Sequence, residues 1–489
     1  MNMVSKGRLA VLVVASVICI SCGDVYRPTI VPEPVTPPNP QNFHTVFTAN
    51  TNGTVNPGSA LQIDVSGDTN AGTTNVGIAP VHIAIQPGAS SIQTRVWAVN
   101  PGSDSVSVFT AAGSVGSITT STTLNLIPGS QPVFAHSTES ATMYIANAGN
   151  GTVNAITTIT NAIAATIPVG TTPWAMAETP DGHKLYVVNR DSNNVTSVNT
   201  TDRSVAPPIA VGPSPQWALA RSDSHRVYVL DSDGTVFDID SESTSGTVDT
   251  VRATFSVAQD TGLAVAGTSA FFYDNRLNRL HIPFMTPVSG GVLYEDAIYS
   301  VASDPPALVN VVPVRGPVPA PCAQCAPISA TALQDGTRAY VASYIIDPNP
   351  NNCATTQVQG YPMQSCMAIQ VAVINELNNT VSKVISLPEV AVSPVKTPGN
   401  PPVLVTTTVD CSNPTVTRFR LLTASAADST RVFVSSCDVG GVATIQTTND
   451  TYVTTVKAPV SLLDPILYNS GTGSKFPPPQ SPMFLVAGP

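Results

Sequence analysis

Charged side chains are scarce in this sequence. They make up 11% of the residues, and 31 Asp and Glu outnumber 21 Lys and Arg, so the formal net charge is −10. An acidic surface repels the phosphate backbone of nucleic acids. We therefore expect no nucleic-acid partner.

Familiar catalytic motifs are also missing. The sequence contains no Gly-x-Ser-x-Gly elbow, no His-Glu-x-x-His zinc motif, no phosphate loop ending in Gly-Lys and no paired-carboxylate signature. These absences remove the positive evidence for an enzyme without excluding one, because an enzyme can assemble its site from residues that lie far apart in the sequence. We predict no catalytic residue, no cofactor and no metal site from the sequence.

No apolar run is long enough to span a bilayer. The longest candidate, residues 9–21, follows Lys6 and Arg8 and ends at Ser21, directly before Cys22. This arrangement resembles the signal of bacterial lipoproteins, although Cys19 stands where such signals usually carry Leu or Val. The resemblance implies a signal peptide over 1–21, an acylated Cys22 and an exported protein held at the cell envelope, in the periplasm or the outer-membrane leaflet. An ordinary secretory signal with an incidental cysteine is the alternative.

The next segment, residues 22–41, contains six prolines. Proline-rich segments favour extended polyproline conformations over sheets or helices. We interpret this segment as a tether between the membrane and the folded domain.

Six further cysteines occur in the second half of the chain. An even number in an exported protein favours disulfides, and six cysteines allow 15 pairings. We expect Cys353–Cys366 and Cys411–Cys437. Cys322 and Cys325 have the spacing of a metal or redox pair, but no second such pair accompanies them, so a structural bridge is the preferred interpretation.

A short phrase recurs with a fixed period. It begins at Thr142, Lys184 and Arg226, a spacing of 42 residues, and each copy is a short apolar strand ending in Asn or Asp. Within one period, residues 173–178, 185–188, 195–198 and 204–211 are predicted strands separated by turn residues. Four short antiparallel strands repeated at this period are typical of a β-propeller blade.

The phrase Tyr186-Val187-Val188-Asn189, with Ile167-Pro168-Val169-Gly170 before it, resembles the YVTN repeat. The resemblance is clear over about residues 95–245 and weaker beyond. It implies an exported bacterial β-propeller, similar in fold to lactonase-type propellers.

Counting the second strand of each unit predicts eight blades, with the seven usual for that family as the alternative. These strands are residues 44–50, 95–100, 142–147, 184–189, 226–231, 279–284, 338–343 and 431–436. Pro283 interrupts the sixth and predicts an edge strand or a bulge there. The first unit lacks a strand before residue 44, so we predict that residues 482–486 become its innermost strand and close the ring. We expect one all-β domain over 42–489, with insertions at about 344–367 and 388–418.

Two sets of residues are candidates for ligand binding. The polar residue that ends each second strand could form a ring on one face, although turn capping explains the same residues. Aromatic residues and a histidine at the start of the first strands could line the channel mouth, although packing between blades explains them too. The candidates are His82, Phe134, Trp174, Trp217, Asn147, Asn189 and Asp231.

These observations favour a binding or interaction scaffold at the cell envelope. Its partner would be a protein, a polysaccharide or a small ligand, and the chain would be a monomer. A lactonase-like hydrolase with its site at the channel mouth is the alternative, and it rests on the family resemblance alone.

Overall fold

The computed structural model describes residues 45–488 apart from the segments 66–67, 88–92, 113–117, 139–140, 269, 319–327, 348, 350, 352–356, 359–360, 363–365, 389, 392–410, 412–418, 461–466, 470–473 and 477–478. The predicted signal peptide, the acylation site Cys22 and the tether lie outside the described residues. So do Cys322, Cys325 and Cys353.

The domain is a β-propeller of eight blades, which confirms the higher of the two predicted counts. Each blade is an antiparallel sheet whose strands are numbered here from the axis outward. Blade 1 contains β38 (Ser481–Ala487), β1 (Thr45–Asn52), β2 (Asn56–Asp64) and β3 (Thr69–Ile78). Blade 2 contains β4 (His82–Ile85), β5 (Gln93–Asn100), β6 (Ser105–Ala112) and β7 (Ile118–Asn125). Blade 3 contains β8 (Pro132–His136), β9 (Thr142–Asn147), β10 (Thr152–Thr157) and β11 (Ala162–Pro168).

The next three blades continue the same order. Blade 4 contains β12 (Pro173–Glu178), β13 (Lys184–Asn189), β14 (Asn194–Asn199) and β15 (Ile209–Ala210). Blade 5 contains β16 (Pro215–Ala220), β17 (Arg226–Asp231), β18 (Thr235–Asp240) and β19 (Val251–Ser256). Blade 6 contains β20 (Gly267–Thr268), β21 (Phe272–Asp274), β22 (Arg279–Val288), β23 (Gly291–Ser300) and β24 (Ala307–Val318).

The last two blades carry additional elements. Blade 7 contains β25 (Ile328–Ala332), β26 (Arg338–Asp347), β29 (Cys366–Asn375), β30 (Thr380–Ser386) and the added β31 (Val390–Ala391). Blade 8 contains β32 (Leu421–Ser425), β33 (Arg431–Ser436), β34 (Gly441–Gln446) and β35 (Thr451–Lys457). Outside the blades lie the small hairpins β27 (Gln357–Val358) with β28 (Tyr361–Pro362) and β36 (Leu467–Asn469) with β37 (Ser474–Phe476), the 3-10 turn η1 (Pro101–Ser103) and the helix α2 (Val257–Thr261).

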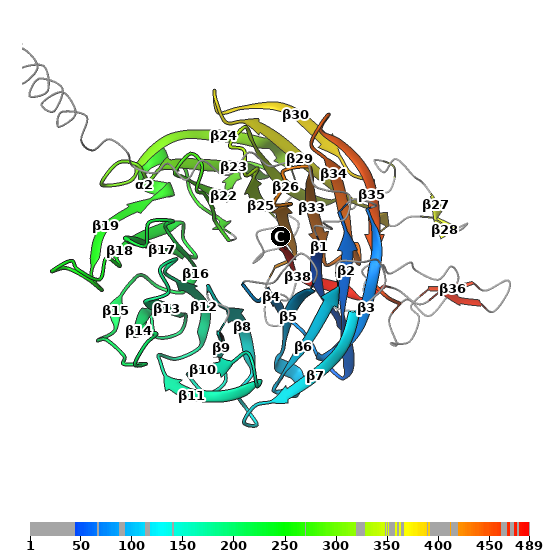
Figure 1. The fold of residues 1–489 in the computed structure, drawn as a ribbon. Helices are drawn as coiled ribbons and strands as arrows, with labels where there is room; N and C mark the ends of the chain where they lie inside the picture. Colours follow the sequence, from blue (N-terminus) through cyan, green and yellow to red (C-terminus); the bar gives the residue numbers. More distant parts are fainter. Residues whose placement is uncertain are drawn as a thin grey trace, which may run out of the picture. The chain divides into compact units, whose positions relative to one another are not determined.

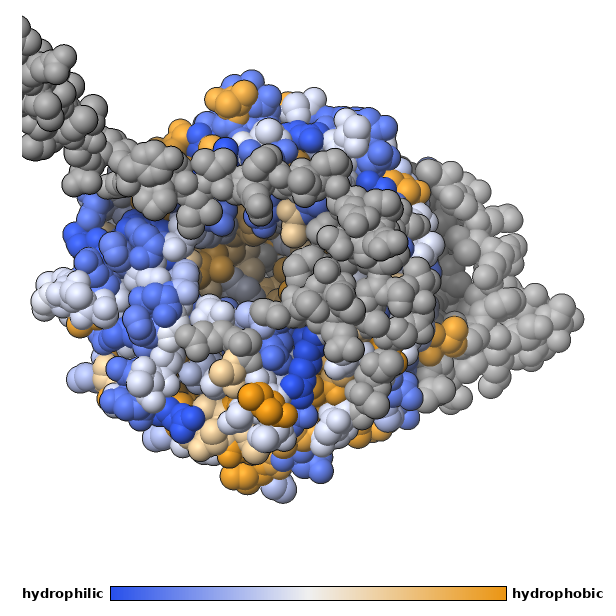
Figure 2. Space-filling view, in the orientation of Figure 1, coloured by the Kyte–Doolittle hydropathy of each residue, from blue (hydrophilic) through white to orange (hydrophobic). Residues whose placement is uncertain are grey.

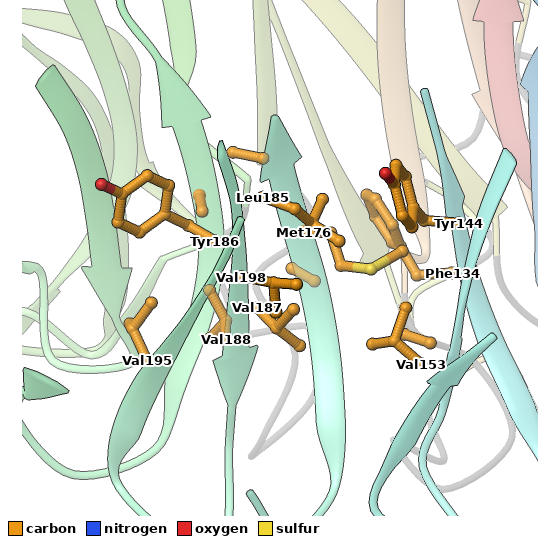
Figure 3. Close-up of a cluster of buried hydrophobic side chains, with 14 of the residues drawn as sticks. Phe134, Tyr144, Val153, Met176, Leu185, Tyr186, Val187, Val188, Val195 and Val198 are labelled. Atoms are coloured by element: carbon orange, nitrogen blue, oxygen red, sulfur yellow. The ribbon is translucent and has the colours of Figure 1, made fainter. Parts of the chain in front are cut away.

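The second strands read as continuous apolar runs because both faces of a blade are covered by its neighbours. Leu185, Tyr186, Val187 and Val188 are all fully buried. Figure 3 shows Leu185 and Val187 pointing toward the side chains of blade 3, whereas Tyr186 and Val188 point to the other side. β-branched and aromatic residues suit such a two-sided pleated surface. The hydrophobic core is therefore a series of seams between successive blades.

The ring closes as the sequence predicts. β38 pairs antiparallel with β1 from Val46↔Ala487 to Thr51↔Ser481, and the C-terminal strand lies beside the N-terminal one in Figure 1. Blade 1 thereby takes its innermost strand from the end of the chain and its other three from the start. No end of the ring is left with an exposed pair of sheet edges at this junction.

Blade 6 departs from the sequence prediction at Pro283. β22 is an inner strand, paired with β23 along its whole length without a register shift, so neither the predicted edge strand nor the predicted bulge is found there. The innermost strand is instead divided: β21 pairs with residues 279–281 and β20 with Phe284 and Met285. Pro283 falls between the two pieces, where its missing N–H removes no ladder hydrogen bond.

Cations near the start of the second strands join successive blades. Each reaches the turn between the third and fourth strands of the next blade, where a carboxylate or a carbonyl oxygen accepts its hydrogen bond or ion pair. We call these contacts latches; they are Arg95 to Thr158 and Asn161, Lys184 to Asp249, Arg226 to Asp304, Arg279 to Glu376 and Asn379, Arg338 to Asp450, and Arg431 to Asp68. The Lys or Arg of the repeated phrase is thus explained by the seam that it bridges.

One predicted disulfide is confirmed. Cys411 and Cys437 are bonded, and the bridge packs against Met483 of the closing strand. Cys366 is also disulfide-bonded. The first predicted insertion is partly strand, because β26 continues to Asp347 and β29 begins at Cys366.

The two faces of the ring differ in their connections. Turns between second and third strands, and connections from one blade to the next, lie on the face where the second strands end in Asn or Asp; we call it the Asn-turn face. The helix α2, the hairpin β27–β28 and the hairpin β36–β37 all belong to connections on this face. The opposite face carries the latches.

Candidate functional site

The first strands place equivalent residues around the axis near the Asn-turn face. The equivalence follows from register, since each pairs with the residue that precedes the terminal polar residue of the second strand. In blades 1 to 5 the pairs are Phe484↔Ala49, His82↔Val99, Phe134↔Ala146, Ala175↔Val188 and Trp217↔Leu230. Four of these five positions carry an aromatic or imidazole ring.

These rings meet one another across the axis. The His82 ring lies 4.0 Å from Phe134 and 4.0 Å from Phe484, centroid to centroid. Trp217 lies 5.4 Å from Phe134, 5.3 Å from Phe419 and 6.4 Å from Phe484, and Phe419 lies 5.7 Å from Phe484. Offset and edge-on contacts at these separations are favourable. We call these five residues, contributed by blades 1, 2, 3, 5 and 8, the mouth cluster.

The mouth cluster presents only part of its surface to solvent. His82, Phe134 and Phe484 are buried, whereas Trp217 and Phe419 are partly exposed. Figure 2 shows that the ring is hollowed near its centre and that apolar atoms line part of this hollow. Concave sites with apolar walls and few polar groups are the usual form of small-molecule pockets.

Two histidines, His82 and His136, lie on the first strands of blades 2 and 3. Nδ1 of His82 accepts a hydrogen bond from the Ala135 N–H at 3.3 Å, so this nitrogen carries no proton. His136 lies two residues beyond Phe134 on β8, and burial lowers its pKa to about 4. Its Nε2 atom has no hydrogen-bond partner among the described residues. His136 is therefore a neutral imidazole at neutral pH.

Trp174 lies beside the mouth cluster without belonging to it. It occupies the bulge between the pairs Pro173↔Asn189 and Ala175↔Val188, and it is partly exposed. The guanidinium carbon of Arg190 lies 4.2 Å from the centre of its ring. Of the four predicted first-strand residues, the structure thus brings His82, Phe134 and Trp217 together and places Trp174 on the rim.

The predicted polar ring is buried at the ends of the second strands. Asn147 donates to Thr152 and Asn154, and Asn189 donates to Asn194 and Thr196 in the same way. In three blades a glycine that precedes the blade lies against the polar side chain that ends the second strand: a Cβ at Gly77 would be 2.7 Å from Asn100 Cγ, and one at Gly170 would be 2.6 Å from Asn189 Cγ. A Cβ at Gly212 would be 2.0 Å from Asp231 Oδ2. These contacts tie the recurrent Gly to the recurrent Asn or Asp.

Asp231 differs from its asparagine counterparts because it has no amide to donate. Its side chain is fully buried, and neither carboxylate oxygen has a hydrogen-bond partner among the residues described. Thr196, which accepts a hydrogen bond from Asn189 in blade 4, corresponds by register to Phe237 in blade 5. The phenyl ring of Phe237 offers Asp231 no hydrogen-bonding group. Burial, with a smaller contribution from the charge of Asp233, raises the pKa of Asp231 to about 8. The carboxyl group is therefore largely protonated at neutral pH.

A second buried polar group lies at the seam of blades 6 and 7. His281 Nδ1 is 2.8 Å from Asp296, and its Nε2 is 3.1 Å from Glu376 without hydrogen-bond alignment. Burial alone would lower the pKa of His281, but the two carboxylates outweigh it and raise the pKa to about 10. Arg279 also pairs with Glu376 at 2.7 Å. The group is a charge-balanced part of the latch at this seam.

Sequence reasoning missed Phe484 and Phe419 as members of the cluster. Phe484 was detectable, because residues 482–486 were already predicted to be the first strand of blade 1, and alignment with the other first strands places Phe484 opposite His82. Phe419 precedes β32 and follows a segment with no repeat pattern. No signal in the sequence identifies it.

Neither a metal site nor a membrane-spanning helix is found in the described part of the chain. No group of three or more His, Cys, Asp or Glu side chains there could hold a metal ion. No helix among the same residues is long and apolar enough to cross a bilayer.

Comparison with known proteins supports the fold. No protein-family profile and no curated protein sequence matches the chain. Among solved structures it is similar to AztD from Citrobacter koseri, with a TM-score of 0.50 and 11% identity over 91% of this chain and 98% of that one. It is also similar to virginiamycin B lyase from Staphylococcus aureus (TM-score 0.41, 11% identity, 74% and 92% of the two chains) and to Kuenenia stuttgartiensis hydrazine synthase (0.46, 16%, 68% and 88%). At these identities the likeness concerns the fold alone.

Proposed function

We propose that this chain is a cell-envelope binding scaffold whose ligand site is the channel mouth on the Asn-turn face. The single observation that carries the proposal is the mouth cluster, in which five blades direct aromatic or imidazole rings to one place. Blade packing needs contacts between neighbouring blades only. Contacts between blades 1 and 5, as in Phe484 and Trp217, go beyond that requirement.

A small ligand with an apolar, ring-like face suits this surface best. Trp217, on strand β16, and Phe419 offer partly exposed ring area, and aromatic side chains bury large area at low entropic cost. Ser329 of β25, whose hydroxyl is hydrogen-bonded to Thr423 at 3.0 Å, adds a polar group among the first strands. A free ring compound or one sugar ring of a polysaccharide would satisfy this chemistry.

The same geometry argues against the hydrolytic alternative. A lactonase-like site needs Glu, His or Arg groups converging on the bound ester. The cluster contains one such residue, His82, and its ring is enclosed between Phe134 and Phe484 with Nδ1 already hydrogen-bonded. The surface that remains accessible is aromatic, which supports binding.

Substitution of Trp217 tests the site. We expect the uncharged dye N-phenyl-1-naphthylamine to bind the wild-type chain and to bind Trp217→Ala at least about tenfold more weakly, because the ring that supports it is gone. Dye fluorescence measures the affinity, and circular dichroism checks that the variant is folded. Ile159→Ala, an 85% exposed site on the opposite face, is the matched control. A folded Trp217→Ala variant with wild-type affinity would contradict the proposal.

The envelope location rests on the leader, and it has its own test. We expect metabolic labelling with palmitate to mark the wild-type protein and to leave Cys22→Ser unlabelled, because the thiol is the acylation site. The variant should also move from the membrane fraction to the soluble fraction. Retained label in Cys22→Ser, or none in the wild type, would refute the lipid anchor and leave the mouth site untouched.

A further inference from the structure

The rim of the mouth on blade 4 carries a fixed arginine. Arg190 begins the turn after β13, and its backbone N–H donates to Thr172 O at 3.0 Å. The same turn is held to the start of β12 by Thr172 Oγ1 donating to Asp191 at 2.6 Å and by Thr171 N–H donating to Ser192 at 3.0 Å. The guanidinium of Arg190 lies over the Trp174 ring, and these hydrogen bonds hold the turn that carries it in place.

Stacking leaves the hydrogen-bonding edge of this guanidinium available. A planar guanidinium that lies over an aromatic ring uses its face for the ring and keeps its N–H donors in the plane. Nε donates to Asp191 at 3.0 Å. The two terminal nitrogens have no hydrogen-bond partner among the described residues, and the side chain is 32% exposed. The arginine latches on the opposite face differ, because at least one terminal nitrogen of each arginine already binds an acceptor of its own or the next blade.

The position of Arg190 relative to the mouth follows from register. Trp174 precedes Ala175, and Ala175 occupies on blade 4 the position that Phe134 and Trp217 occupy on blades 3 and 5. Because Ala175 has only a methyl group, Trp217 reaches past it to Phe134, and the two ring centroids are 5.4 Å apart. Trp174, whose ring carries the Arg190 guanidinium, is the residue next to Ala175, so Arg190 belongs to the blade that stands between these two rings.

We propose that the ligand of the channel mouth is an organic anion, with an apolar ring placed on Trp217 and a carboxylate, sulfonate or phosphate oxygen bound by the terminal nitrogens of Arg190. This inference rests on the proposed function and adds the charge class of the ligand. In-plane guanidinium contacts to an oxyanion are short and directional. A chain with a net charge of −10 repels anions over most of its surface, so a bound anion needs such a local donor.

A matched pair of dyes tests the inference. 8-Anilino-1-naphthalenesulfonate has the ring system of N-phenyl-1-naphthylamine plus one sulfonate. The protein is the purified chain carrying Cys22→Ser, so that no acyl chain competes for the site. We expect the sulfonate dye to bind the parent chain about tenfold more tightly than the neutral dye. Arg190→Gln should remove that preference while the affinity for the neutral dye stays within about twofold.

Two further variants define the contact. Arg190→Lys keeps the charge without the planar edge, and we expect it to retain only part of the preference. Arg203→Gln removes an exposed arginine from the opposite face of the same blade and should change neither affinity. Equal binding of the two dyes to the parent chain, or an unchanged preference in Arg190→Gln, would overturn the anion inference. If Trp217→Ala weakens the neutral dye in that case, the mouth site itself stands.

Discussion

Removal of residues 481–489 should abolish cooperative unfolding of the propeller. β38 supplies every first-strand contact of blade 1, and its Met483, Phe484 and Leu485 side chains are buried. Burial of each such side chain contributes about 2–3 kcal/mol, and the strand also satisfies the backbone of β1. The sum is comparable with the whole stability of a typical domain, about 5–15 kcal/mol. Thermal unfolding followed by circular dichroism should show a broad or absent transition.

Two single substitutions, one in the closing strand and one control, have expected effects on the free energy of unfolding that can be measured. Leu485→Ala should destabilise the protein by about 2–4 kcal/mol, because a fully enclosed leucine leaves a cavity. Val453→Ala, on the outer strand β35 and 40% exposed, should change stability by less than about 0.5 kcal/mol. A synthetic peptide of residues 481–489 should restore the transition of the truncated chain by strand addition. Unchanged melting of the truncated chain would refute closure by this strand.

Asp231→Asn should stabilise the protein, and the gain should grow with pH. The folded-state pKa of Asp231 is about 8, whereas an unfolded aspartate titrates near about 3.9. Between these values the folded chain binds the extra proton, so the free energy of unfolding falls as pH rises. The two pKa values differ by about 4 units, so at about 1.4 kcal/mol per unit we expect a gain of about 5 kcal/mol at pH 8 and almost none near pH 4. Chemical denaturation across this range measures it.

The reciprocal exchange in blade 4 is the control. Asn189→Asp places a carboxylate where an amide now donates to Asn194 and Thr196, so both donations are lost. We expect this variant to be destabilised, with a loss that increases from pH 4 to pH 8. If Asp231→Asn gave the same gain at both ends of the range, the carboxyl group would not be titrating in the fold, and the explanation by burial would be wrong.

The repeat pattern was sufficient to predict most of the architecture. The strands beginning at Thr142, Lys184 and Arg226 are found with the predicted bounds, because identical seams impose the same apolar run and the same terminal polar residue on each copy. The closing strand was predictable because blade 1 had one strand too few. The sequence did not reveal that the first strand of blade 6 is divided opposite Pro283, since the proline alone is equally compatible with an edge.

The candidate site was less accessible to sequence reasoning. Position along the first strand identified His82, Phe134 and Trp217, whereas Trp174 lies one residue earlier in the repeat, at the bulge position that Val133 and Gln216 occupy in blades 3 and 5. Phe419 reaches the cluster from outside the repeats. Its contacts depend on the path of a long connection, which periodicity does not describe.

The latches have a consequence for how such a ring changes over evolution. Each one joins a blade to its immediate successor and uses chemically similar ends, a cation on one side and an acceptor-bearing turn on the other. Excision or duplication of one whole blade would therefore bring an existing cation to a turn of the same kind. The number of blades can therefore change without new contacts having to arise on this face. Two features must be kept: the cation-to-turn contacts between successive blades, and the two chain ends that pair in blade 1.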